Sequence, residues 1–339
     1  MPKALESLPA KLRDGLDAAV LKAKLTTMQA DRAFQSVSPC ARLEDLAGAD
    51  LVIEAASEDL ALKRELFARL DAVCPDAVLA TNTSSLSVAA IAQAVKAPAR
   101  VLGIHFFNPP VAMKLVEMIR TEMTSPEVFH GAWDFVLMGL RKTPVDVKDT
   151  PGFIVNRVMR PYYVESLRVV EEGQGTPLSV DNRARENGAP LGPFALMDLI
   201  GLDVNLAITK SIYEALGRPE RFKPSPIQQD YVDNGELGRK TGRGFYVYED
   251  GKLKPDAMWR GMNPRIAGFL PAGCRYDFAG PLAPDPWPRM AGAIFAEARG
   301  LVEAGAAGKN DVDTAIRLAM NFPKGPFEWQ SENTARPAN

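Results

Sequence analysis

The first 150 residues alternate short apolar runs with longer stretches of helical periodicity, and this alternation limits the possible folds more than any other feature. The runs have the length of buried strands and lie at residues 49–55, 78–81, 101–106 and 143–148. Stretches of about 10–20 residues between strands supply the helices of right-handed crossovers. We therefore predict an α/β fold with a parallel sheet. A helix over residues 3–30 precedes it, with a kink or break at Pro9.

The chain changes character after Pro151, where long amphipathic helices continue to about residue 230. Residues 250–287 are rich in proline and glycine and read as a linker, and residues 288–329 are helical again. The predicted division is therefore an α/β domain at 1–149, a helical domain at 150–250, a linker at 251–287, and a further helical domain at 288–339.

The two helical parts repeat one another. ESLRVVEEG at 165–173 matches EARGLVEAG at 297–305, and Asp181 then matches Asp313. The tripeptide GPF recurs at 192–194 and 325–327, so the offset of 132 residues becomes 133. Two unrelated amphipathic helices would not share these turn residues. We predict a duplication in which residues 288–329 pack against residues 158–200 as a pseudo-twofold pair.

Composition excludes several classes of function. The net charge of −2 gives no general attraction to nucleic acid or to an anionic membrane, and no apolar run is long enough to span a bilayer. The first residues carry scattered charges and do not resemble a secretory signal. Three widely spaced cysteines form no disulfide or metal pattern, which suits the cytoplasm. With only His105 and His130 present, a histidine metal site is not expected.

Polar residues follow two of the predicted strands. Ser84 and Ser85 lie in NTSSLS after the strand at 78–81, and His105 ends the strand at 101–106. Ligands of open α/β sheets bind at the carboxyl ends of the strands. The alternatives are that the serines cap the next helix and that the histidine is a buried core residue.

Glu117 is the carboxylate that could accompany His105. It lies twelve residues further on, beyond a Pro-Pro reversal that can return the chain to contact. A carboxylate on one imidazole nitrogen fixes the tautomer and leaves the other nitrogen to accept a proton. Asn156, in DTPGFIVNR at 149–157, could reach into a cleft between the domains. A structural role for the pair, and a simple hinge at 149–157, remain open alternatives.

Six motifs occur in the order and spacing of the 3-hydroxyacyl-CoA dehydrogenases, which the chain resembles over about residues 3–330: NTSSLS, GIHFFNPP, MKLVE, DTPGFIVNR, GPF with LMDLIGLD, and GRKTGRGFY. The resemblance implies a Rossmann-type NAD-binding domain followed by the family's all-α domain and a partial second copy of it. It also implies NAD-dependent oxidation of an acyl-CoA substrate in fatty-acid β-oxidation or related catabolism.

The resemblance further assigns roles to single residues. It implies His105 as the catalytic base and Glu117 as its partner, with Ser84 and Asn156 binding the reacting oxygen. For the cofactor it implies Glu58 and Lys63 near the nicotinamide ribose and Asn108 near the nicotinamide itself. No metal is implied. Lys22 and Lys24 are candidates for CoA phosphate contacts, with a solvated helix face as the alternative.

One family feature is missing from these 339 residues. No G-x-G-x-x-G occurs, and the sequence begins at what resembles the helix after the second strand. The sequence therefore predicts an N-terminally truncated, incomplete sheet with an exposed edge at 49–55, and weak NAD binding. A related hydroxy-acid or sugar-acid dehydrogenase and an inactive remnant are the alternative functions. Association into a homo-oligomer remains open.

Overall fold

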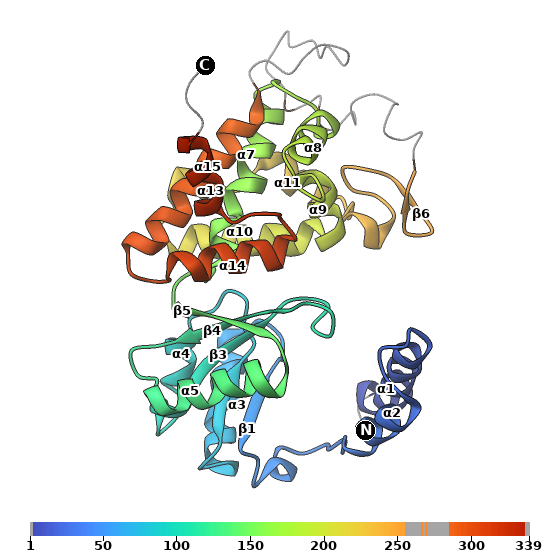
Figure 1. The fold of residues 1–339 in the computed structure, drawn as a ribbon, viewed down its shortest axis with the longest axis vertical. Helices are drawn as coiled ribbons and strands as arrows, with labels where there is room; N and C mark the ends of the chain where they lie inside the picture. The colour runs from blue at the N-terminus through green and yellow to red at the C-terminus, as the bar shows by residue number, and fades with distance from the viewer. Residues whose placement is uncertain (1–2, 255–265, 267–268, 270–284, 336–339) are drawn as a thin grey trace.

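The computed structural model describes residues 3–254, 266, 269 and 285–335 (Figure 1). Most of the predicted linker at 251–287 and the last four residues of the second helical copy lie outside this part. Figure 1 places a sheet with its helices below and a group of helices above, with α1 and α2 to one side.

A five-stranded sheet in the order β1-β2-β3-β4-β5 forms the lower part. Its strands are β1 (Leu51–Glu54), β2 (Val78–Thr81), β3 (Val101–Phe106), β4 (Leu115–Arg120) and β5 (Thr143–Lys148). All four predicted strands are present, and β1 forms the edge of the sheet as predicted, with the Ile53 side chain 36% exposed.

The sheet departs from the predicted parallel arrangement at β4. Strands β1, β2 and β3 are parallel, but β4 pairs antiparallel with β3, and β5 is parallel to β4. Residues 107–114 between β3 and β4 are too few for a crossover helix, which requires about a dozen residues or more, so the chain reverses directly. The sheet is therefore mixed.

The strands alternate between two cores, as the period of two in a strand requires. Val101 and Ile119 face the larger core, which contains α3 (Leu60–Val73) and α4 (Val88–Ala92) and continues into the upper helices. Leu102 and Ile104 face a smaller core closed by α5 (Pro126–Asp134) and the π-helical turn Phe135–Gly139. Burial on both faces explains why the strands read as continuous apolar runs.

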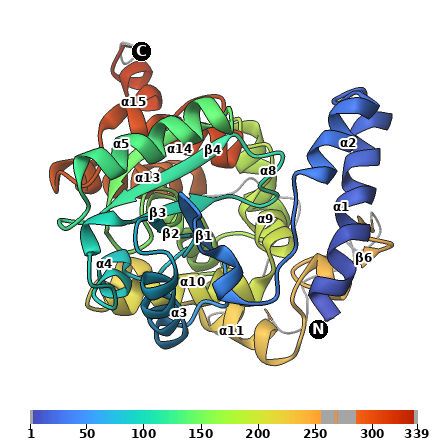
Figure 2. The same ribbon diagram turned by 90° about the horizontal axis from the view of Figure 1, so that it is seen from below.

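The single helix predicted over residues 3–30 is instead a pair, α1 (Lys3–Leu21) and α2 (Thr27–Gln35). Helix α1 continues through Pro9, and the break falls at residues 22–26. Thr26 starts α2 with a capping box, because its hydroxyl accepts from the Gln29 backbone N–H while the Gln29 side chain accepts from the Thr26 backbone N–H. Both views show this pair standing beside the main body (Figures 1 and 2).

The upper part is helical, as predicted. Its first copy and the following segment contain α6 (Val155–Val158), α7 (Arg160–Glu171), α8 (Pro177–Glu186), α9 (Pro193–Ile200), α10 (Leu202–Ala215), α11 (Pro226–Asp233) and the short ribbon β6 (Tyr248–Glu249) with β7 (Lys252–Leu253). The second copy contains α13 (Pro286–Glu303), α14 (Lys309–Met320) and α15 (Pro326–Ala335). Single 3-10 turns lie at Leu43–Leu46, Pro98–Arg100, Glu220–Phe222 and Arg239–Thr241.

The two helical copies pack together, as predicted, with α13 lying along α7 (Figure 1). Their matched turns are also built alike. Asp181 accepts from the backbone N–H groups of Phe194 and Ala195, and Asp313 accepts from that of Phe327. A Cβ placed on Gly192 or Gly325 would lie only 2.3 Å from the Cα of the matching aspartate, so both GPF turns need glycine for the same close approach.

Candidate active site

His105 and Glu117 lie directly opposite one another in the antiparallel pair β3–β4. His105 Nδ1 is 2.6 Å from Glu117 Oε2, which confirms the predicted contact. The Glu117 side chain is fully buried, and His105 is 6% exposed. The bond uses Nδ1, so Nε2 is the imidazole nitrogen left to exchange a proton with a ligand.

The second oxygen of Glu117 holds the segment that links the sheet to the helices. Glu117 Oε1 accepts from the backbone N–H groups of Ile154 at 3.0 Å and Val155 at 2.8 Å. The preceding turn reaches this position because Gly152 and Phe153 both have positive φ, at 76° and 49°. Three hydrogen bonds therefore compensate the burial of one carboxylate.

Ser84 lies in a turn organised by Glu58. Glu58 Oε1 accepts from Thr83 Oγ1 at 2.7 Å and from the Ser84 backbone N–H at 2.8 Å, and also from Ser85. Partial burial raises the pKa of Glu58, but these hydrogen bonds and the charge of Lys63 outweigh it, so the pKa lies below its ordinary value. The helix-capping alternative for this motif applies to Ser87, whose hydroxyl accepts from the Ala90 N–H at the start of α4.

Lys63 lies beneath this turn and is 1% exposed. Its Nζ is 2.7 Å from Glu54 Oε1, 3.3 Å from the Ala56 carbonyl oxygen and 3.5 Å from Glu58 Oε2. An ammonium group has three donors, and these three neighbours surround it. The position of Lys63 is therefore suited to fixing Glu58 rather than to reaching a ligand itself.

Asn156 joins the linking segment to the serine turn. Its Nδ2 donates to the Ser84 backbone carbonyl at 3.3 Å. Three motifs that are distant in sequence, those containing Ser84, His105 and Asn156, are thus connected through Asn156 and Glu117. Asn108 lies exposed in the loop after β3, and Lys22 and Lys24 are exposed between α1 and α2.

Two residues of the NTSSLS motif were not singled out from the sequence. Asn82 Oδ1 accepts from the Phe106 backbone N–H at 2.8 Å, which ties the end of β2 to the end of β3. Thr83 is fully buried, and its hydroxyl donates to Glu58. Polar residues directly after a buried strand were the available signal for both.

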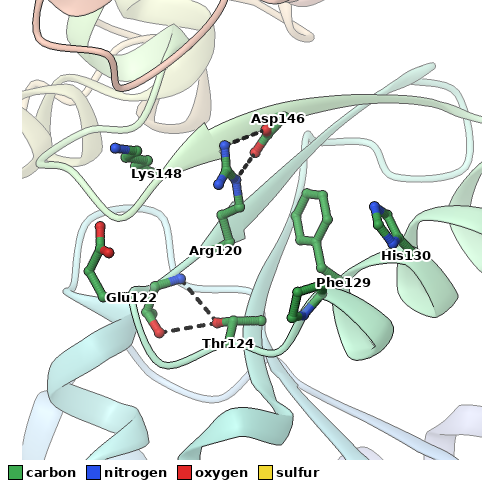
Figure 3. Close-up of a pocket in the computed structure, with 9 residues that line it drawn as sticks. Arg120, Glu122, Thr124, Phe129, His130, Asp146 and Lys148 are labelled. Carbon is green, nitrogen blue, oxygen red and sulfur yellow. Dashed lines mark hydrogen bonds and ion pairs between the residues drawn. The ribbon is translucent and has the colours of Figure 1, made fainter.

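The structure also has a polar pocket of about 480 Å³, which Figure 3 draws with its lining residues. Its lining includes Arg120, Phe129, His130, Asp146 and Lys148. The Arg120 guanidinium pairs with both oxygens of Asp146 at 2.8 Å. None of the residues predicted to act in catalysis or cofactor binding lines this pocket.

Within the described residues, no group of three or more His, Cys, Asp or Glu side chains has an arrangement that could hold a metal ion. The helices in the same part of the chain include none with the length and apolar character needed to cross a bilayer.

Comparison with known proteins gives matches along most of the chain. The family description "3-hydroxyacyl-CoA dehydrogenase, NAD binding domain" matches residues 1–150. The description "3-hydroxyacyl-CoA dehydrogenase, C-terminal domain" matches residues 152–248 and 287–334, which contain the two helical copies.

Individual relatives agree with these matches. The 3-hydroxyadipyl-CoA dehydrogenase of Escherichia coli (strain K12) is 35% identical, over 98% of this chain and 83% of the relative. A probable 3-hydroxybutyryl-CoA dehydrogenase of Bacillus subtilis (strain 168) is 40% identical, over 74% and 87%. The crystal structure of 3-hydroxybutyryl-CoA dehydrogenase from Escherichia coli K12 superposes with a TM-score of 0.85 at 34% identity, over 98% of this chain and 85% of that one. The chain therefore belongs to the 3-hydroxyacyl-CoA dehydrogenase family, whose N-terminal domain binds NAD.

Proposed function

We propose that this chain oxidises the 3-hydroxyl group of a 3-hydroxyacyl-CoA thioester to the 3-oxo compound, with NAD as the oxidant. The observation that supports this most strongly is the buried His105–Glu117 pair, linked through the segment 154–156 to Ser84. Oxidation of a secondary alcohol requires a base for the hydroxyl proton and donors for the forming carbonyl oxygen, and this cluster offers both.

The described residues fit the nicotinamide end of NAD. Glu58 presents a partly exposed carboxylate near the carboxyl ends of the parallel strands β1 and β2, where dinucleotides lie in such sheets. A carboxylate is a suitable acceptor for ribose hydroxyls. In this proposal Glu58 holds the ribose, Lys63 fixes Glu58, and Asn108 lies beside the nicotinamide. When bound, NAD supplies the hydride acceptor, which no side chain can provide.

His105 accepts the hydroxyl proton at Nε2, while Glu117 stabilises the imidazolium through Nδ1. The two backbone donors to Glu117 Oε1 keep its other oxygen directed at the imidazole. The Ser84 hydroxyl and the Asn156 amide hold the substrate oxygen as it becomes a carbonyl. The Ser84 hydroxyl has one proton, which it now donates to Glu58, so it must exchange that partner for the substrate oxygen. The Asn156 NH₂ group has two N–H donors, so it can keep its bond to the Ser84 carbonyl while the second N–H donates to the substrate oxygen.

The proposal extends to substrate, location and assembly. An acyl-CoA substrate agrees with the names of the two relatives, and Lys22 and Lys24 are candidates for contacts with its phosphates. We place the reaction in the cytoplasm, in fatty-acid β-oxidation or related acyl-CoA catabolism; the free thiols of Cys40 and Cys74 suit that compartment. Because α13 already covers α7 within one chain, a homo-oligomer would use another surface.

The test is reduction of acetoacetyl-CoA, followed as loss of NADH absorbance at millimolar NADH. We expect turnover with acetoacetyl-CoA and at least about 100-fold less with free acetoacetate at the same concentration, because the CoA part contributes binding energy to the reaction. Equal rates with both compounds would favour a hydroxy-acid dehydrogenase. Absence of turnover with either would contradict the proposal.

A further inference from the structure

A largely buried ion pair joins the second helical copy to residues 154–156, the active-site segment. Arg157, the residue directly after Asn156, donates from Nε to Glu297 Oε1 of α13 at 2.6 Å. Glu297 is 5% exposed, and its other oxygen accepts from Arg221 Nε at 2.8 Å. Arg157 also donates to Thr150 Oγ1 at 2.9 Å, so the same side chain closes the turn from 150 to 157.

The second copy also holds the strand that leads into this segment. The Lys148 backbone N–H donates to the Ala306 carbonyl at 2.8 Å, and the Asp146 N–H donates to Asp311 Oδ1 at 3.2 Å. An isolated antiparallel bridge joins Val147 to Ala307 between these two contacts. The linking segment is thus fixed by the second copy just before it starts and again where α6 begins.

An equivalent ion pair exists on the other side of the interface between the copies. Arg289 Nε donates to Glu165 Oε2 at 2.7 Å. Residues 157 and 165 correspond to residues 289 and 297 at the repeat offset of 132, so each copy contributes its arginine to the other copy's glutamate. Such reciprocal exchange is the mark of a twofold interface. Of the two pairs, it is Arg157–Glu297 that adjoins the active-site segment.

We infer that Glu297 is a positioning residue for catalysis, acting through Arg157 on the backbone of residues 154–156. That backbone supplies the two N–H donors to Glu117 and carries Asn156. The second copy therefore does more than stabilise the fold, since it sets the geometry of the base partner and of one oxygen-binding group. The inference rests on the proposed function for the roles of Glu117 and Asn156.

The matched variants are Glu297→Gln and Glu165→Gln, which neutralise corresponding buried carboxylates in the same interface. Glu297→Gln should lower kcat by about tenfold to a hundredfold, since small displacements remote from the reacting atoms have effects of this size. KM for acetoacetyl-CoA should change less than about threefold, and Glu165→Gln should leave kcat within about twofold. Equal effects of the two variants on kcat would overturn the inference.

A double-mutant cycle separates positioning from general destabilisation. In an Asn156→Ala background, Glu297→Gln should have a clearly smaller effect on kcat than in the wild type. The reason is that the Asn156 amide, one of the groups that Glu297 positions, is already removed. Fully additive losses would contradict the inference. If Glu297→Gln fails to fold, Arg157→Lys replaces it in the cycle, because it keeps the charge and loses the planar fork.

Hydrogen exchange tests the same inference without turnover, so its failure is distinguishable from failure of the proposed function. Exchange of the amides of residues 152–158 should accelerate at least about fivefold in Glu297→Gln and not in Glu165→Gln. Unchanged exchange in both variants would overturn the positioning role, whether or not the wild-type protein reduces acetoacetyl-CoA.

Discussion

Glu117 Oε2 lies 2.6 Å from His105 Nδ1 across the antiparallel pair β3–β4, while the other carboxylate oxygen receives two backbone N–H groups. The carboxylate cannot rotate without losing hydrogen bonds at both ends. The imidazole is therefore held with a proton on Nδ1 and with Nε2 free to act as a base.

The substitution Glu117→Gln tests this tautomer control. The oxygen of the introduced amide would accept from the backbone of Ile154 and Val155, which turns the NH₂ group of that amide toward His105 Nδ1. An amide donor forces Nδ1 to accept, so the proton moves to the nitrogen that should act as base. We expect kcat to fall by about 10²–10⁴-fold, the usual contribution of a positioned base.

Steady-state kinetics with acetoacetyl-CoA measures that change, and thermal unfolding shows whether the variant is folded. Glu122→Gln is a matched control, because this glutamate lines the separate polar pocket. Turnover of Glu117→Gln within a few-fold of the wild type would show that the tautomer is set in some other way.

Much of the sheet could be predicted from apolar runs, because burial on both faces makes a parallel strand visible in sequence. Strands β2, β3 and β5 have the expected bounds. The direction of β4 was not predicted, since an apolar run has the same appearance in either orientation. The break between α1 and α2 did have a signal, because Thr26 and Gln29 have the spacing of a capping box.

Some contacts of the candidate active site could likewise be inferred from the sequence, and others could not. The contact between His105 and Glu117 could be inferred from a reversal between two apolar runs. The role of Glu58 as the acceptor that organises the Ser84 turn could not be inferred from the sequence, because it depends on how the loop after β1 is placed beside β2. The reciprocal ion pairs between the copies were also beyond sequence reasoning, since the alignment of a repeat does not show which of its faces meet.

A buried pair of aspartates predicts an unusual dependence of stability on pH. Burial raises the pKa of Asp198 to about 7, against the hydrogen bonds from the backbone of Phe245 and Tyr246. Burial likewise raises the pKa of Asp181 to about 6. Both folded-state values lie above the unfolded value of about 3.9, so the folded protein binds more protons between about pH 4 and pH 7.

These aspartates therefore stabilise the fold less as the pH rises through that window. The free energy of unfolding should fall between about pH 5 and pH 8, by an amount on the order of a few kcal/mol. Urea denaturation at the two pH values measures it. Asp198→Asn should lower the stability at the lower pH. It should also make the free energy of unfolding depend less steeply on pH, because one of the two titrating groups is gone. If the free energy of unfolding of Asp198→Asn depended on pH as steeply as that of the wild type, the assignment of this pH dependence to Asp198 would be contradicted.

The matched glycines of the GPF turns give a prediction on stability. Gly325→Ala would place a methyl group 2.3 Å from the Cα of Asp313, which neither backbone can accommodate without moving. We expect a loss of about 1–3 kcal/mol or more, and a similar loss for Gly192→Ala against Asp181.

Gly300→Ala serves as the control, because the added methyl would have no heavy atom within 4 Å apart from the neighbouring residues and backbone of its own helix, α13. This change should raise stability by about 0.5–1 kcal/mol through better helix propensity. Chemical denaturation compares the three variants. A gain in stability for Gly325→Ala, like the gain expected for Gly300→Ala, would contradict the close approach between Gly325 and Asp313.

The central claim is that His105 is the base of an NAD-dependent 3-hydroxyacyl-CoA dehydrogenase, and the two histidines of the chain allow a direct test. His130 is exposed in the polar pocket, away from the predicted catalytic residues, so His130→Gln is the matched control for His105→Gln. The measurement is kcat for acetoacetyl-CoA reduction at saturating NADH. We predict a loss of about 10²–10⁴-fold for His105→Gln and less than about twofold for His130→Gln. Near-normal turnover of a folded His105→Gln variant would contradict the account.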